Sequence, residues 1–223
     1  MHPGIWKGKN VETVKQKLLI LGESHYVSDF RNNHDALGKV SFTTRNIVEE
    51  YLKYHISNGR WSFFTKIAKT FGYNTEGEIR KFYDLVYFGN YVNVLVDKAG
   101  EQNGDYFIDK NKEVYNKELL DFCVNSSIEI IACFSIKAYE NLPMAGNKPQ
   151  DDMSIQRENK KSIVLRKWLY EKGSLEDKSL ILDKDLLVYG ICHPSWQAGY
   201  DANLVYDEYI KKQQELQWLC NVS

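Results

Sequence analysis

The chain has 223 residues, of which 43% are hydrophobic and 26% charged, and its formal net charge is −1. This is the composition of a globular domain, and it excludes a disordered or collagen-like chain. The nearly neutral charge argues against a strongly basic nucleic-acid coat, although it permits a local basic face. Because no run of about 18 apolar residues occurs and residues 1–8 lack an apolar signal core, we expect a cytoplasmic protein without a membrane partner.

The four cysteines form no Cys-x-x-Cys pair, so the sequence gives little support for a zinc or iron–sulfur site. We expect no metal and no cofactor. Free cysteine behaves as a small apolar residue, and core packing in a reducing compartment is the expectation for all four. They are Cys123, Cys133, Cys192 and Cys220.

The first predicted strand ends abruptly in polar residues. A polar arm, residues 1–16, leads into the apolar run 18–21, which stops at Gly22. The residues that follow are Glu23, Ser24, His25 and Tyr26. In an open parallel α/β sheet, ligands bind just beyond the carboxyl ends of the strands. This cluster is therefore the first candidate for a ligand-binding site.

Two helices are predicted to follow a loop at 27–41. The first, 43–55, begins with Thr43 or Thr44 as its cap and buries one apolar face. The second, 61–71, is rich in aromatic residues that we assign to the core, and it stops at a glycine.

Downstream, strands alternate with helices. We predict a short helix at 76–81 and then a strand at 85–92 with Asn90 near its end. A surface excursion at 97–112 and a helix at 114–125 follow. The next strand, at 128–133, leads into a short helix capped by Ser135. Residues 143–161 are rich in Pro, Gly, Asn and Asp and are expected to form a flexible insertion. The chain closes with a helix at 163–170, a strand at 186–192 and a long amphipathic helix at 203–219.

This alternation predicts an α/β fold in which helices cover both faces of a parallel sheet, in a single domain over residues 1–223. The last strand runs directly into His193-Pro194-Ser195. We expect its end and the cluster at 22–26 to meet over one pocket.

The ordered set of Gly22-Glu23-Ser24-His25-Tyr26, Asn90 and His193-Pro194-Ser195 resembles the uracil-DNA glycosylase superfamily. In that family a strand ends in a Gly-Gln-Asp-Pro-Tyr-type or Gly-Glu-Ala-Pro-Gly-type loop, a later strand presents an Asn, and the last strand runs into His-Pro-Ser. The resemblance covers about residues 17–200.

The resemblance implies a three-layer α/β/α sandwich with a central four-stranded parallel sheet. It also implies a hydrolase of DNA repair, a DNA glycosylase that binds DNA, flips a damaged base out of the stack and cleaves its N-glycosidic bond, with uracil as the default base. The partner would be DNA or a nucleobase or nucleotide ligand, and we expect a monomer.

Residue roles follow from the same resemblance. Catalysis falls to Glu23, Ser24 and His193, with His193 stabilising the departing base anion. Base binding falls to Gly22, His25, Tyr26, Phe42 and Asn90, with Phe42 as the stacking ring and Asn90 as the base-reading amide. The wedge that fills the gap in the duplex would be Ser195, Trp196 and Gln197.

The sequence departs from the best-known branch of the family at the first loop. Ser24 stands where that branch has its catalytic Asp, His25 where it has Pro, and Glu23 where it has Gln. Glu23 could then orient or activate water.

Two other functions are compatible with these residues. One is a base- or nucleotide-binding module of the same fold with weakened catalysis. The other is a Gly-Asp-Ser-type serine hydrolase, in which Ser24 attacks an ester and His193 is its base. That hydrolase family carries Asp three residues before its His, and Gly190 occupies this position here.

Overall fold

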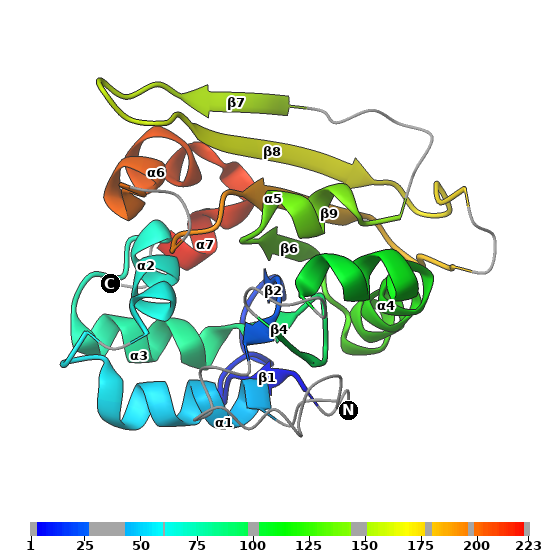
Figure 1. Ribbon diagram of the computed structural model, residues 1–223, viewed down its shortest axis with the longest axis horizontal. Helices are drawn as coiled ribbons and strands as arrows, with labels where there is room; N and C mark the ends of the chain where they lie inside the picture. The colour runs from blue at the N-terminus through cyan, green and yellow to red at the C-terminus, as the bar shows by residue number, and fades with distance from the viewer. Residues whose placement is uncertain are drawn as a thin grey trace.

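The computed structural model describes residues 4–26, 43–59, 61–97, 103–143, 151–176, 180–195 and 199–220. The strands of its main sheet are β1 (Trp6–Lys7), β2 (Leu18–Gly22), β4 (Tyr87–Asn90), β6 (Ile130–Cys133), β7 (Asp151–Ile155), β8 (Ile163–Tyr170) and β9 (Leu186–Ile191). They form a mixed seven-stranded sheet in the order β1-β4-β2-β6-β9-β8-β7 (Figure 1).

The centre of this sheet is parallel. β4, β2, β6 and β9 pair in parallel, and they are the four strands that the sequence predicts. The sheet is wider than predicted, however, because β1 adds to one edge and β8 and β7 to the other, all antiparallel.

Both faces of the sheet are covered, which explains why β2 is apolar along its length. Leu18 and Ile20 point into one buried cluster, whereas Leu19 and Leu21 point into the other. The helices are α1 (Thr43–Glu50), α2 (Ser62–Thr70), α3 (Glu76–Leu85), α4 (Gly104–Ser126), α5 (Ile136–Glu140), α6 (Ala202–Glu208) and α7 (Gln217–Cys220). α4 and α5 pack on one face and the other five on the opposite face (Figure 1).

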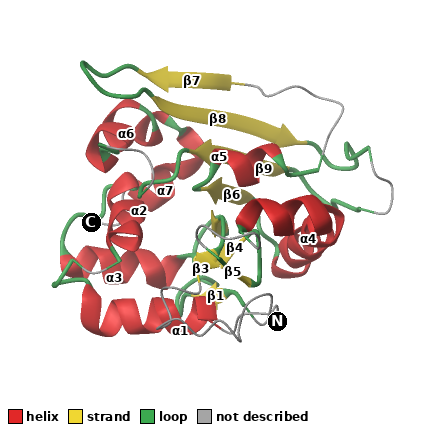
Figure 2. Cartoon of the chain, viewed as in Figure 1, coloured by secondary structure: helices red, strands yellow, loops and turns green. Residues whose placement is uncertain are grey.

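A second, two-stranded sheet lies beyond the end of β2. β3 (His25–Tyr26) pairs in parallel with β5 (Leu95–Val96) (Figure 2). This pairing fixes the direction in which the chain leaves Gly22.

Residues 163–170 were expected to be helical, and this prediction is wrong. They form β8, whose residues 165–170 pair with β9. Ile163 and Leu165 are buried while Val164 between them is exposed, which is the two-residue alternation of a strand. The flexible insertion expected at 143–161 likewise contains a strand, β7, at 151–155, and residues 144–150 lie outside the described part of the chain.

Three helix predictions have the wrong limits. The short helix expected at 76–81 is α3, which extends to Leu85. α4 starts within the expected excursion at 97–112, because Asn103 caps it and accepts a hydrogen bond from the backbone N–H of Tyr106. The closing helix is broken after α6, since Tyr209 leaves the helical region and buries its ring against Tyr189. Short 3-10 segments at Ile210–Lys212 and Gln214–Leu216 then lead into α7.

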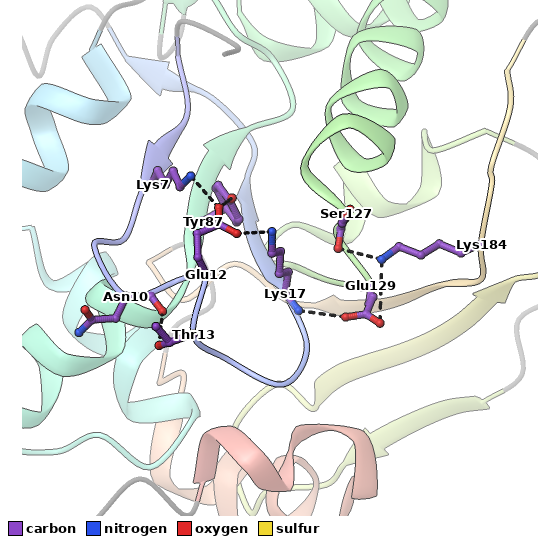
Figure 3. A network of polar contacts seen from close by, with 9 residues as sticks. All are labelled: Lys7, Asn10, Glu12, Thr13, Lys17, Tyr87, Ser127, Glu129 and Lys184. Carbon is purple, nitrogen blue, oxygen red and sulfur yellow. Dashed lines mark hydrogen bonds and ion pairs between the residues drawn. The ribbon is translucent and has the colours of Figure 1, made fainter.

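A chain of ion pairs runs along the amino-terminal ends of the parallel strands (Figure 3). Glu12 contacts the ammonium groups of Lys7 and Lys17 at 2.6 and 2.5 Å. The backbone N–H of Lys17 donates to Glu129, whose carboxylate also lies 3.9 Å from Lys184. These contacts join the starts of β2, β6 and β9. The polar residues at 23–26, 90 and 193–195 lie at the opposite ends of the strands.

Three cysteines, Cys123, Cys133 and Cys192, are buried free thiols, which agrees with the prediction of core packing. Among the described helices, none combines the length and the apolar character that crossing a membrane requires.

Candidate functional site

A cavity of about 290 Å³ opens beyond the carboxyl ends of β2, β4 and β9. The residues that line it are Glu23, Ser24, His25, Tyr26, Ile47, Gly59, Trp61, Ser62, Phe63, Phe64, Asn90, His193 and Ser195. The three polar segments predicted to converge therefore do so. The volume lies at the lower end of the roughly 300–1,000 Å³ typical of small-molecule sites, which suits a ligand of one or two rings.

Asn90 is positioned by strand pairing. It lies opposite Gly22 in the parallel ladder of β2 and β4, and its Oδ1 packs against the glycine, where a side chain would collide with it. Its buried Nδ2 has no hydrogen-bond partner among the described residues, and neither does the buried hydroxyl of Ser24. A buried polar group without a partner is costly, so these two groups are well suited to bind a ligand.

Glu23 is held by a residue that follows the neighbouring strand, β6. The Ser135 hydroxyl donates to its Oε2 at 2.7 Å, and the same hydroxyl caps α5 by accepting from the N–H of Ala138. Gly104, the first residue of α4, lies close to the other carboxylate oxygen. Since the N-terminus of a helix favours a negative charge, this is a suitable place for a carboxylate.

His193 follows β9 and is a neutral imidazole. Burial, and after it the charge of Lys66, lowers its pKa to about 4. Its Nδ1 lies 3.2 Å from the backbone N of Ser195 and accepts that hydrogen bond. The neutral ring therefore carries its hydrogen on Nε2, which acts as a donor.

His25 is also neutral, because burial lowers its pKa to about 4. Its Nε2 lies 2.9 Å from the Thr44 hydroxyl at the start of α1. It lines the cavity, and its contact with α1 fixes the first loop.

The sequence did not predict three contributors from the start of α2. Phe63 stacks on the His193 ring, with centroids 4.7 Å apart and planes 19° apart. Lys66 donates to the carbonyl oxygen of Pro194 at 2.9 Å. Trp61 lines the cavity with its backbone in the left-handed region at φ +56°, which is rare for a bulky residue.

For the aromatic residues, though not for Lys66, the sequence holds one signal. Phe63 and Phe64 are adjacent in sequence and cannot share one helix face, so one of them has to point away from the core. Three predicted residues, Phe42, Trp196 and Gln197, lie outside the described part of the chain. Among the described residues, no group of three or more His, Cys, Asp or Glu side chains is placed to hold a metal ion.

The comparisons with known proteins give no match: no protein-family model fits the sequence, and no curated protein or solved structure is significantly similar to the chain.

Proposed function

We propose that this protein is a DNA glycosylase-like hydrolase of the uracil-DNA glycosylase type, which cleaves the N-glycosidic bond of a flipped-out damaged base. The observation that carries the proposal is the meeting of Glu23, Asn90 and His193 at one cavity. These residues are 67 and 103 positions apart along the chain. Residues that resemble the family only by their order in the sequence therefore also line the same cavity.

The strand order supports the same proposal. Numbered along the chain, the four parallel strands stand in the order second, first, third, fourth. In such a sheet the direction of winding reverses between the first and third strands, and ligands bind at this point. Glu23 follows the first strand, and its partner Ser135 follows the third. A three-layer sandwich of the glycosylase type is the fold we propose on this basis.

The chemistry fits the side chains. Cleavage of a glycosidic bond places negative charge on the departing base, and donors aimed at that charge stabilise it. The Nε2–H of His193 and the Nδ2 of Asn90 are such donors. On the sugar side, Glu23 orients or activates the attacking water, in place of the Asp that Ser24 replaces.

A serine hydrolase is less well supported. The hydroxyl of Ser24 has no hydrogen-bond partner among the described residues, so it is not bonded to the imidazole of His193. A nucleophile of this kind needs a base within hydrogen-bonding distance.

The test is base release from labelled oligonucleotides, single- and double-stranded, that carry uracil, hypoxanthine or other modified bases. Alkali then converts each abasic site to a strand break. We expect release of at least one base and a loss of roughly 10²–10³-fold in rate for His193→Ala, the scale for removing one donor to a developing anion. Asn90→Ala should also lose activity, whereas the exposed Asn74→Ala, on the loop before α3, should not.

No strand breaks across the whole panel, with active control enzymes, would contradict the catalytic proposal. Tight binding of one base, with turnover no faster than that of His193→Ala, would favour the binding module instead.

A further inference from the structure

One face of α2 contacts the segment 193–200, which begins with His193. Phe63, Lys66 and Thr70 are spaced i, i+3 and i+7, so they lie on the same side of the helix. Phe63 stacks on the ring of His193, and Lys66 binds the carbonyl oxygen of the next residue, Pro194.

Thr70 makes the third contact. Its hydroxyl donates to the carbonyl oxygen of Lys66 and lies 2.8 Å from the hydroxyl of Tyr200. Because the single hydrogen of Thr70 is used in the first bond, Tyr200 donates the second. Tyr200 is buried, so both ends of the segment 193–200 are fixed to the same helix.

These contacts affect two properties of His193, the orientation of its ring and its protonation. The ring stack sets the plane of the imidazole, and the bond to Pro194 fixes the backbone that supplies the N–H of Ser195 to Nδ1. The titratable groups near His193 are Lys66 from α2, which acts on its charge, and Glu23, His25 and Tyr26 from the first loop, which line the same cavity. Among them, Lys66 is the cation that opposes protonation of the imidazole.

We propose that Lys66 is a positioning residue for His193: together with Phe63 it holds the ring and its supporting backbone so that the Nε2–H is directed into the cavity. The role in catalysis rests on the proposed function, but the effect on the ring does not. A purely structural lysine would change stability and leave the titration and tautomer of His193 as they are.

The experiment follows His193 by ¹⁵N and ¹H NMR of the imidazole in the full chain between pH 4 and 8, with His193→Asn used to assign its signals. The wild type should keep the hydrogen on Nε2 down to about pH 5, because its pKa lies near 4. In Lys66→Met the titration midpoint should rise but stay below the ordinary range of histidine, because burial, the larger cause of the lowered pKa, remains. Lys66→Arg, which keeps charge and donors, should restore it.

Lys69→Met is the matched control, since the lysine that it removes lies on the same helix but makes no hydrogen bond or ion pair to the described residues of 193–200; it should titrate like the wild type. Phe63→Leu provides a second, independent variant, in which the ring-current shift of the His193 protons should be lost. Titration in Lys66→Met that is indistinguishable from the wild type would overturn the proposal. If Lys66→Met fails to fold, Lys66→Gln takes its place, and titration and a tautomer indistinguishable from those of the wild type would overturn the proposal.

If base release is observed, Lys66→Met should lower kcat by roughly 10–100-fold with little change in KM, as expected when a reacting group is misplaced. If no base is released by any variant, the glycosylase proposal fails, while the NMR titration still decides the role of Lys66.

Discussion

Gly22 has no side chain, and the amide of Asn90 occupies the space that a Cβ there would need. A Cβ on Gly22 would fall well inside van der Waals contact with the Asn90 side-chain oxygen. The amide can therefore occupy its place at the end of β4 only beside a glycine. This requirement is one of space, since the close approach alone excludes a larger residue.

Gly22→Ala should displace the Asn90 amide. We expect a loss of about 1–3 kcal/mol in the free energy of unfolding, the usual cost of overpacking, and base release or ligand binding reduced at least tenfold. Urea unfolding and the oligonucleotide assay measure the two effects. Gly77→Ala in α3 is the control: its Cβ meets no atom within 4 Å, and it should be as stable as the wild type or more so. Equal stability of the two variants would contradict this account.

At this scale the sequence predicted part of the site. Glu23, Asn90 and His193 were identifiable because each follows an apolar strand and together they resemble a known order. Lys66 was not identifiable, because its acceptor lies 128 residues away and nothing local distinguishes it from a solvated lysine. Phe63 was hidden in a helix whose other aromatic residues belong to the core.

At the scale of elements, α5 connects a helix cap to the site. One hydroxyl, that of Ser135, accepts from the first turn of α5 and donates to Glu23. The start of the helix and the orientation of the carboxylate are thus coupled through a single atom.

Ser135→Ala should therefore have two effects. Loss of the cap should lower the free energy of unfolding by about 1 kcal/mol. Turnover should also fall, because the carboxylate of Glu23 loses the hydrogen bond that orients it. Thr75→Ala removes the cap of α3, which accepts from the N–H of Glu78, and it should reduce stability by a similar amount with turnover unchanged. Circular dichroism with urea gives the first quantity and base release the second. Equal turnover of the two variants would mean that Glu23 does not depend on Ser135.

The elements were predicted unevenly for a physical reason. The four parallel strands are buried on both faces, so their apolar runs stand out in the sequence. β8 has Arg166, Lys167 and Trp168 at its centre, all half-buried, and this mixture resembled an amphipathic helix. Its strand character is set by pairing with β9 on one side and β7 on the other, which local sequence does not encode.

On the scale of the whole molecule, the sheet separates two kinds of polar residue. The ion pairs around Glu12 and Glu129 lie at the amino-terminal strand ends, whereas two neutral histidines, the buried His25 and the half-buried His193, lie at the carboxyl ends. The parallel core could be predicted, but the width of the sheet could not, because the edge strands depend on partners distant in sequence.

These neutral histidines predict how stability depends on pH. An unfolded histidine titrates near 6.5, whereas His25 in the fold has a pKa of about 4. Between these values the unfolded chain binds a proton that the folded chain does not, so the free energy of unfolding should fall as the pH is lowered from 6.5 to 4. The contribution is fully present above pH 6.5, and for His25 the loss should amount to about 3 kcal/mol at pH 4.

Urea unfolding at pH 7 and pH 4.5 measures this effect. In His25→Gln the difference between the two pH values should shrink, because the titrating group is gone. Thr44→Val removes the hydrogen bond to His25 but keeps the imidazole, so its pH dependence should stay close to that of the wild type. The same difference in His25→Gln and the wild type would show that other groups govern the acid sensitivity.

The outer strand β7 has a consequence for the behaviour of the protein at high concentration. It ends the sheet on one side, and an edge strand can pair with a second chain that extends the ladder, the first step of fibre growth. Asp152 is exposed on this strand, so two chains that meet there at neutral pH bring like charges together. We expect Asp152→Asn, which removes this charge, to promote self-association along this border.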